Sequence, residues 1–465
     1  MNFSLNQVKE RFAELIRLNP EDQKIYLVGG VVRDLVLERV NKDIDVLCEL
    51  ETRSIAHKLA EAKKGAYFVL DEERNTCRVI TTDSGVKRIY DFARQQGNSL
   101  IEDLKARDFT INAMAVDLDA PDVLIDPLHG SDDLKNGILR VCSPDSFQSD
   151  PVRVIRALRY SLAYQLKIDP ETMILLKDSV PALQSISGER KRDEIFKILD
   201  LPDPTPALVL LQETGIFTEL GMSELTSSDF DLSKQLALLL NTIGDQHQIQ
   251  PDESISGFED LSEYFSRYQQ LLGKKNSSDR NLRQLLFLNS ILESSDFDTA
   301  KQIVQSLMLS NEEVERVLVT QKYIGELPGA GDRIKSISDR DLYLLINKTD
   351  EASLDICLLV LSRKIADLSQ EKNKEELKLF LGLTRKIFEA WFDRQNVMKP
   401  VPFLNGNDLM MIFDVSAGPL IGKLLEKLKE EQAAGTITNH EQALEWMEEQ
   451  VNKDFDQRHW NRGKA

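Results

Sequence analysis

The sequence predicts an α+β protein in which a mixed α/β domain is followed by a long, all-helical region. Two observations lead to this fold class. Residues 1–140 alternate between short apolar runs typical of strands and segments typical of helices, which is the pattern of a mixed α/β domain. After about residue 142 the strand signals fade, and apolar residues recur at helical spacing through the rest of the chain.

The individual elements follow from these patterns in chain order. An apolar run at 25–28 ends at Gly29-Gly30, and a helix is expected to start in 31–37. Residues 111–117 fit a helix and a strand equally well. The other expected strands are 44–47, 67–70, 78–81 and 88–92. Apolar stripes predict helices near 152–162, 195–199 and 421–428.

Composition excludes several classes of protein. Of the 465 residues, 42% are hydrophobic and 29% are charged, which is ordinary for a folded chain of roughly three domains. There are 58 Lys and Arg against 77 Asp and Glu, so the net charge is −19. Such an acidic chain is a poor candidate for indiscriminate nucleic-acid binding, although it can hold a local basic groove.

Cysteine spacing and hydropathy predict a cytoplasmic protein. The four cysteines are far apart, which argues against a zinc site or a disulfide scaffold and favours a reducing compartment. The first twenty residues carry charges throughout, so we expect no signal peptide. No run of 18 apolar residues occurs, so no membrane span is expected.

The first candidate for chemistry is the stretch from residue 25 to residue 47. A strand that runs into two glycines and then a helix lets backbone N–H groups approach a phosphate, and Arg33 lies one helical turn further on. The same pattern also occurs as a simple tight turn. Asp43 and Asp45 alternate along the next strand and so face one side, where they can hold divalent ions, unless they form only a polar strand face. Asp91, on another expected strand, is a possible third carboxylate or a plain surface residue.

A second candidate is a stripe of polar residues at 150–159. Its members lie three residues apart, so on one helix they form a slanting row opposite buried apolar positions. A carboxylate can accept from the exocyclic amino group of cytosine or adenine, while Arg donates to ring acceptors. The alternatives are a helix N-cap for the acidic residue, with Pro151 at N1, and a solvated basic face for the arginines. The stripe consists of Asp150, Arg153, Arg156 and Arg159.

Together these stretches resemble the class II tRNA nucleotidyltransferase family, which includes CCA-adding enzymes, their CC-adding and A-adding variants, and bacterial poly(A) polymerases. Five motifs occur in the order of that family, and the tail from residue 404 onward is also similar. The motifs are GGVVRD with DID (29–34 and 43–45), LKARDFTINAMAVD (104–117), IDPLHGSDDLKNGILRVCSPDSF (125–147), SDPVRVIRALRY (149–160) and SGERKRDEIFKIL (187–199).

The resemblance implies a polymerase-β-like head at 1–140, a helical neck at 141–200 that selects the nucleotide, a helical body at 201–330 and a tRNA-binding tail at 331–465, in an elongated arrangement. It implies tRNA, CTP and ATP as substrates, and Mg²⁺ held by the catalytic pair Asp43 and Asp45. It further implies that nucleotide contacts come from Gly30, Arg33, Arg107, Asp150, Arg153, Arg156 and Arg159, with Asp108 and Asn112 organising ribose or Arg107. Because the chain is acidic, we expect the tRNA-facing surface to be a local basic strip.

The sequence departs from the family pattern in three places. Ser149 stands where the selecting motif usually has Glu, and Ala106 stands where the second motif usually has Arg. The connection from Asp91 to Arg107 is also shorter than the flexible loop of CCA-adding relatives, which resembles the CC-adding variants. The expected activity is therefore addition of C, as CC or CCA, to the tRNA end.

Other functions remain as alternatives. One is a poly(A) polymerase acting on RNA 3′ ends, although the C-terminus lacks the basic extension common in such proteins; another is an A-adding enzyme. A small-molecule nucleotidyltransferase would lack the stripe and the long helical region. A degenerate RNA-binding relative would have a broken carboxylate pair. A fused phosphohydrolase domain is excluded, since none of the five histidines is followed by Asp.

Overall fold

The computed structural model describes residues 5–19, 23–83, 85–244, 261–276, 280–327, 337–367 and 371–462. The chain divides into two compact units. Unit 1 comprises residues 1–195 and 210–219, and unit 2 comprises residues 196–209 and 220–465. The division of the chain into head, neck, body and tail stays a prediction.

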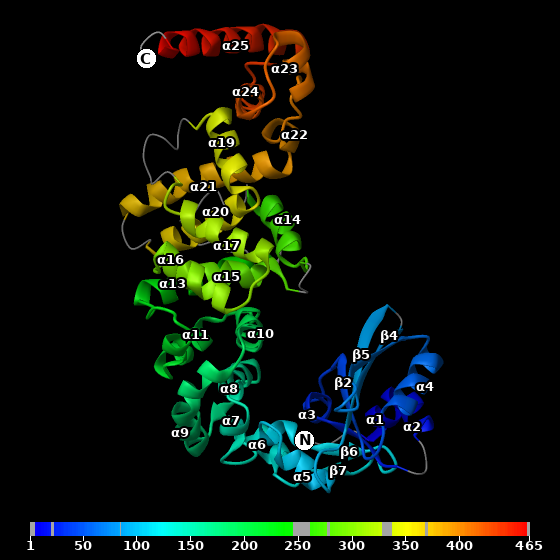
Figure 1. Ribbon diagram of the computed structural model, residues 1–465. Coiled ribbons are helices and arrows are strands. Elements are labelled where there is room, and N and C mark those ends of the chain that lie inside the picture. Colours follow the sequence, from blue (N-terminus) through cyan, green and yellow to red (C-terminus); the bar gives the residue numbers. More distant parts are fainter. Residues whose placement is uncertain are drawn as a thin grey trace. The chain divides into compact units, whose positions relative to one another are not determined.

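Unit 1 is built on a seven-stranded sheet with the strand order β3-β4-β5-β2-β1-β6-β7 (Figure 1). All neighbouring strands are antiparallel except β2 and β5, which run parallel. The sequence predicted the first five of these strands. The strands are β1 (Ile25–Val28), β2 (Asp43–Cys48), β3 (Ala66–Asp71), β4 (Thr76–Asp83), β5 (Val86–Arg94), β6 (Ala115–Asp117) and β7 (Leu124–Ile125).

Helices and short connections complete unit 1. The ambiguous segment 111–117 splits into a 3₁₀ turn at Thr110–Asn112 and strand β6. Strands β8 (Ile138–Leu139) and β9 (Lys167–Ile168) form a small parallel pair. The sequence did not predict β9, because its two residues gain strand structure only from a distant partner. The helices are α1 (Leu5–Arg11), α2 (Ala13–Arg17), α3 (Gly30–Val36), α4 (Arg53–Lys63), α5 (Leu100–Lys105), α6 (Gly130–Asn136), α7 (Ser146–Ser149), α8 (Arg153–Ala163), α9 (Pro170–Ser179), the 3₁₀ helix Val180–Ser185 and α12 (Ile216–Glu219), with α10 (Gly188–Leu199) and α11 (Thr205–Glu213) shared between the units.

A hydrophobic core covers the face of the sheet on which α4 packs. This core determines to which face the side chains of Asp43 and Asp45 point. Helix α4 packs on β4 and β3, and its residues Ile55 and Leu59 are buried. The strands contribute alternate residues to this face, among them Cys77 and Val79 of β4 and Val46 of β2, which are all at most 1% exposed. Because strand side chains alternate, the residues between them point to the other face.

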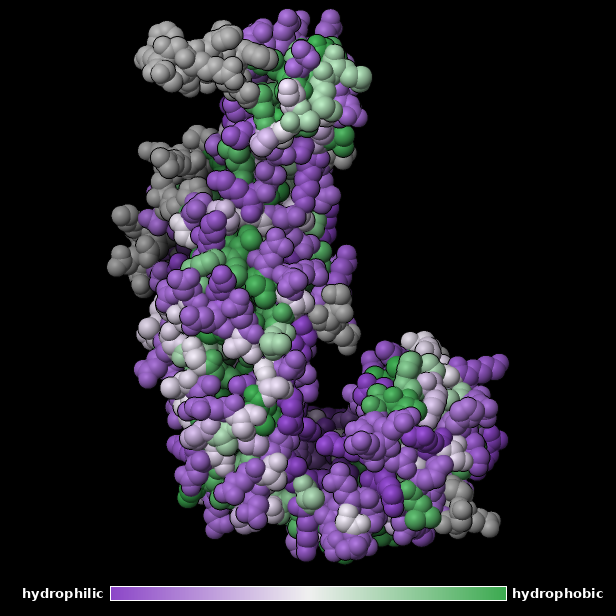
Figure 2. Space-filling model, in the orientation of Figure 1, coloured by the Kyte–Doolittle hydropathy of each residue, from purple (hydrophilic) through white to green (hydrophobic). Residues whose placement is uncertain are grey.

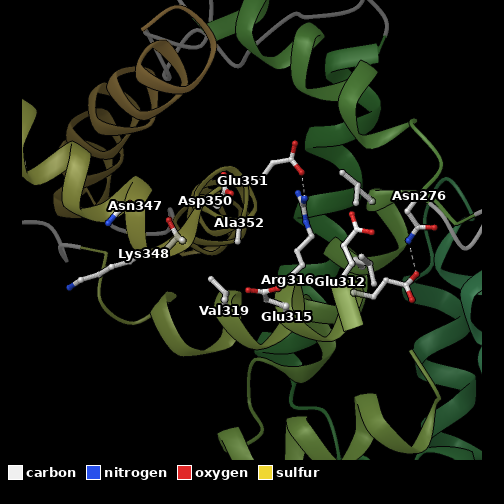
Figure 3. Close-up of a pocket in the computed structure, with 14 residues that line it drawn as sticks. Asn276, Glu312, Glu315, Arg316, Val319, Asn347, Lys348, Asp350, Glu351 and Ala352 are labelled. Carbon is white, nitrogen blue, oxygen red and sulfur yellow. Dashed lines mark hydrogen bonds and ion pairs between the residues drawn. The ribbon is translucent and has the colours of Figure 1, made fainter. Parts of the chain in front are cut away.

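Within the described residues, unit 2 is helical apart from loops and an isolated bridge between Lys275 and Asn281, as the sequence predicted. It holds a cavity of about 380 Å³ among α15, α17, α19 and α20, lined by charged and apolar side chains (Figure 3). Among the described residues, no helix combines the length and apolar character that a membrane span requires. The helices are α13 (Ser227–Gly244), α14 (Ser262–Leu272), α15 (Leu282–Leu292), α16 (Phe297–Ser306), α17 (Asn311–Tyr323), α19 (Asp339–Thr349), α20 (Ala352–Ala366), α21 (Glu371–Phe392), α22 (Gln395–Met398), α23 (Gly406–Phe413), α24 (Pro419–Ala433) and α25 (His440–Arg462).

Candidate functional site

A polar cavity of about 360 Å³ in unit 1 collects the motifs that the sequence singled out. It lies where the β1–α3 turn, strand β2, the segment after α5 and the start of α8 meet. All the residues that the sequence predicted for the site line it, except Arg159 and the possible third carboxylate Asp91. The lining residues are Gly29, Gly30, Arg33, Asn41, Asp43, Asp45, Arg107, Asp108, Asn112, Asp150, Arg153, Arg156 and Tyr160.

The two glycines leave room beside the carboxylate pair. Gly29 has φ +69°, and a Cβ at this position would lie 2.8 Å from Oδ2 of Asp45 and 3.2 Å from Nη1 of Arg107. A side chain at position 29 would therefore be strained and would also displace Asp45. Gly30 opens α3, and a Cβ there would lie 3.4 Å from both Arg33 and Asn41. The turn thus brings bare backbone to the cavity wall.

Asp43 and Asp45 occupy alternate positions of β2, as predicted. Asp43 is exposed and Asp45 is half-buried. Burial raises the pKa of Asp45; the Arg107 guanidinium and the Gly30 N–H oppose this, and the Asp91 carboxylate adds to it. Divalent cations prefer oxygen ligands, so this pair of carboxylates suits such a cation. Burial makes the ionised form of Asp45 less favourable. Among the described residues, no group of three or more His, Cys, Asp and Glu is arranged to hold a metal.

Arg33 is held in a buried polar network at one end of the cavity. Its Nε donates to Oδ1 of Asp34 at 2.9 Å and its Nη1 donates to Oδ1 of Asn112 at 2.7 Å. The guanidinium lies 4.1 Å from the ring centre of Tyr164. Although burial disfavours the charge, Asp34 raises the pKa of Arg33. The sequence missed Asn41, which donates to Oδ2 of Asp34 at 2.6 Å, because a lone Asn before a strand carries no signal.

Arg107 is oriented by a buried carboxylate that also fixes the short connection before α5. Oδ1 of Asp103 accepts from Nε and Nη2 of Arg107, at 3.2 and 3.1 Å. Oδ2 of the same residue accepts from the backbone N–H of Gln96 at 2.9 Å. The connection is further held by a hydrogen bond from the Asn98 N–H to Glu102. The segment between β5 and α5 is thus short and tied to a cavity residue.

Arg156 joins the second motif to α8. Its Nε lies 2.7 Å from Oδ2 of Asp108, whose Oδ1 accepts from Asn112 at 3.0 Å. Its Nη2 donates to the hydroxyl of Tyr160 at 2.9 Å. Burial disfavours the charge, but Asp108 raises the pKa of Arg156 overall. Tyr160 was not predicted as a site residue, because its apolar-face position fits a core residue equally well.

Asp150 departs from the predicted helical stripe, whereas Arg153 lies on the helix as its first residue. Asp150 has extended backbone and precedes α8, whose N-cap residue is Val152, so it is neither part of the helix nor its side-chain cap. The reason is a tight turn through Pro151 before the helix. Oδ2 of Asp150 accepts from Arg190 at 2.8 Å, whereas its buried Oδ1 has no hydrogen-bond partner among the described residues.

Arg153 lines the cavity at the start of α8 and is held by several hydrogen bonds. Its Nη1 donates to the Arg107 carbonyl at 3.2 Å and to the Ser146 hydroxyl at 2.9 Å, and its Nη2 donates to the Ala106 carbonyl at 3.1 Å. Nε is 4.0 Å from Oδ2 of Asp150. The carboxylate of Asp150 and the guanidinium of Arg153 therefore lie side by side at the cavity.

Two candidates lie outside the cavity lining. Arg159 pairs with Glu194 at 2.6 Å and stacks 4.3 Å from the ring centre of Tyr160, so its contact with nucleotide stays a prediction. Asp91 is the cross-strand neighbour of Asp45, but both its oxygens accept from Arg78, at 2.7 and 2.8 Å. Asp91 thus lies beside the carboxylate pair, and its carboxylate forms an ion pair with Arg78.

Three family models match the chain. They are the Poly A polymerase head domain at residues 25–140, the "Probable RNA and SrmB-binding site of polymerase A" at residues 165–224, and tRNA nucleotidyltransferase domain 2 at residues 290–447. Between them they cover both the sheet-based part of the chain and its helical part.

Curated relatives agree with these models. A CC-adding tRNA nucleotidyltransferase of Geobacter sulfurreducens is 39% identical over 191 residues, which are 41% of this chain and 44% of that enzyme, so the match spans less than half of its length. A CC-adding tRNA nucleotidyltransferase of Synechocystis is 28% identical over 91% of this chain and 92% of its own. A CCA-adding enzyme solved with CTP shares the fold, with a TM-score of 0.64, 22% identity and 94% coverage of each chain.

Proposed function

Because the chain belongs to the class II tRNA nucleotidyltransferase family of CCA-adding enzymes and bacterial poly(A) polymerases, and is a nucleotidyltransferase, we propose that it adds C residues from CTP to the 3′ end of tRNA and stops at CC. The observation that carries the proposal is the shared cavity. The carboxylate pair of β2 lies in the same cavity as the acceptor and donors at the start of α8.

Base selection is the role we assign to Asp150 and Arg153. The unpartnered Oδ1 of Asp150 is an acceptor that a buried ligand donor would satisfy, and the exocyclic amino group of cytosine is such a donor. Uracil has a carbonyl at that position and would face the carboxylate with a second acceptor. Arg153, held by three backbone and hydroxyl oxygens, keeps its guanidinium beside that carboxylate.

The triphosphate would lie along the glycine turn. Gly29 and Gly30 present backbone without side chains, and Arg33, Arg107 and Arg156 supply charged donors on the surrounding walls. All three guanidinium groups are already oriented by neighbouring carboxylates. Positioning of this kind lowers the barrier, because little reorganisation remains to be made at the moment of reaction.

The reaction is a direct displacement at the α-phosphorus. The 3′-oxygen of the RNA forms a bond to that phosphorus, the bond to the β-phosphate oxygen breaks, pyrophosphate leaves, and the hydroxyl proton passes to solvent. We propose that Asp43 and Asp45 hold Mg²⁺, which when bound supplies charge stabilisation to the attacking and leaving oxygens. Proposed substrates are thus CTP and tRNA, with the helical part of the chain holding the tRNA by shape and phosphate contacts.

The preference for stopping at CC rests on the connection between β5 and α5. It spans residues 95–99, and hydrogen bonds to Asp103 and Glu102 fix it in place. CCA-adding relatives carry a longer flexible loop at this position, so a short, fixed connection favours the CC-adding variants. The two curated relatives described above carry that same name.

The test uses purified protein, Mg²⁺ and tRNA transcripts ending at the discriminator base, at C and at CC. Each receives CTP, ATP or both, and products are sized to the nucleotide. Products that stop at CC in the presence of ATP support the proposal. One A added after CC indicates a CCA-adding or A-adding enzyme, and a ladder of A residues indicates a poly(A) polymerase. No incorporation, indistinguishable from Asp43→Ala, would refute transfer altogether.

A further inference from the structure

A row of four side chains crosses the face of the sheet opposite to α4, starting at the carboxylate pair. Asp45 of β2 is directly paired with Asp91 of β5, Asp91 with Arg78 of β4, and Arg78 with Phe68 of β3. Directly paired residues of neighbouring strands present their side chains to the same face. With strands about 4.8 Å apart, Phe68 lies roughly 14 Å from Asp45.

This face is not covered by α4, which packs on the opposite one. Phe68 is 48% exposed, and the side chains of Arg78 and Asp91 are 38% and 35% exposed. Their immediate neighbours Cys77 and Phe92 are buried on the α4 side. Figure 2 shows hydrophobic side chains at the surface over the strands of this part of the chain. An exposed aromatic ring three strands from a reactive site is a surface that a flat ligand can use.

The position of the cavity described above determines from which side of Asp45 the RNA approaches. It lies on the side of Asp45 that holds the β1–α3 turn and the start of α8, and β1 is the neighbour of β2 on that side. In a displacement at phosphorus the attacking and leaving oxygens are roughly in line. If the triphosphate fills the cavity, the attacking hydroxyl must come from the other side of Asp45, where β5, β4 and β3 follow in order.

We propose that the row Asp91–Arg78–Phe68 is the binding surface for the single-stranded 3′ end of the RNA. Arg78 contacts a backbone phosphate, and Phe68 stacks on a base behind the reacting hydroxyl. Single-stranded nucleic acid is generally bound by this combination of cation and aromatic ring. In the free protein Asp91 orients the Arg78 guanidinium through two hydrogen bonds. The donor is therefore already in position when the phosphate binds. The inference rests on the proposed function, which supplies the triphosphate in the cavity.

The first test compares Phe68→Ala with Val69→Ala. Val69 is the next residue of the same strand, is 41% exposed and is paired with Cys77 on the opposite face, so it is a matched control. The probe is a 5′-labelled tRNA transcript that ends at the first C, so that the unpaired discriminator base lies behind the nucleotide with the reacting hydroxyl. We expect Phe68→Ala to raise the Kd for this RNA roughly tenfold, within the range for loss of one stacked base, and Phe68→Trp to restore it.

The expected effect belongs to the single-stranded end alone. A second transcript, trimmed to a blunt acceptor stem, should bind Phe68→Ala and the unaltered protein equally. The KM for CTP should also be unchanged in Phe68→Ala, while the KM for tRNA rises. Val69→Ala should match the unaltered protein in each assay. A Phe68→Ala protein that merely misfolds would instead lose affinity for both transcripts and for CTP.

The second test measures how RNA affinity depends on salt. Loss of one phosphate contact to a single strand should reduce the slope of log Kd against log salt by about 0.7. We expect this reduction in Arg78→Gln but not in Arg78→Lys, which keeps the charge. Because Gln leaves Asp91 unpaired, Arg78→Gln is also combined with Asp91→Asn, and the slope should stay reduced in the double variant.

The outcomes separate this inference from the proposed function. Equal RNA affinity of Phe68→Ala and Val69→Ala, or an unchanged salt slope in Arg78→Gln, refutes the proposed RNA-binding surface even if the protein incorporates C. The binding assays need no catalysis, so they decide the matter even if the protein incorporates no nucleotide. If no nucleotide is incorporated, only the proposed function is refuted, and the RNA-binding surface is judged by the binding assays.

Discussion

Replacing Glu313 by Gln would remove a buried negative charge from unit 2 with little change of shape. Glu313 is the N3 residue of α17 and forms a capping box with Ser310, a position where Gln is also accepted. Its side chain is fully buried and lines the cavity of unit 2. Arg280 donates to it through Nε and Nη2, at 2.7 and 2.6 Å, and Asn276 donates at 2.7 Å.

The size of the effect follows from the pKa of this carboxyl group. Burial disfavours its charge, but Arg280, the Ser310 N–H and Asn276 outweigh burial and lower the pKa from 4.5 to about 2. At about 1.4 kcal/mol per pKa unit, this corresponds to about 3 kcal/mol of stability near neutral pH. Because the pKa is lowered in the folded state, this contribution is complete above pH 4.5 and is lost as the pH falls toward 2.

The assay follows hydrogen exchange of the α17 amides in increasing urea, which reports the opening of unit 2 rather than of the whole chain. Glu313→Gln should destabilise these amides by about 3 kcal/mol more at neutral pH than in fully acidic solution, with roughly half of that difference gone by about pH 3. Replacing the carboxylate by the side-chain amide of Gln also costs hydrogen bonds, but this loss is the same at every pH and cancels in the comparison. A difference that does not change with pH would refute the reasoning.

Three further predictions concern unit 1. Gly29→Ala should lower kcat for C incorporation at least tenfold while circular dichroism stays unchanged, because its Cβ would lie 2.8 Å from Oδ2 of Asp45 at a φ of +69°. Asp103→Asn should raise the KM for CTP several-fold more than the KM for tRNA, since it weakens the orientation of Arg107; equal rises would contradict this. Burial raises the pKa of Cys48 to about 12, so a thiol reagent at neutral pH should modify this residue only after unfolding in guanidinium, as peptide mapping can show.

The strand and the turn that carry the reactive groups could be predicted from local sequence patterns. The period of two along β2 places Asp43 and Asp45 on one face, and the glycine pair predicts the turn into α3. These are local consequences of backbone geometry, so they can be read without knowing the rest of the fold. The five motifs predicted the family for the same reason, because each motif is a short stretch with its own chemistry.

The partner of each charged side chain, in contrast, depends on long-range packing. Arg156 and Arg159 lie three residues apart on α8, yet one lines the cavity beside Asp108 and the other pairs with Glu194. The row that leads from Asp45 to Phe68 depends on which strands are neighbours and in what register. Such pairings join residues far apart in the chain, and their free energy comes from burial and from opposite charges meeting, which no local pattern encodes.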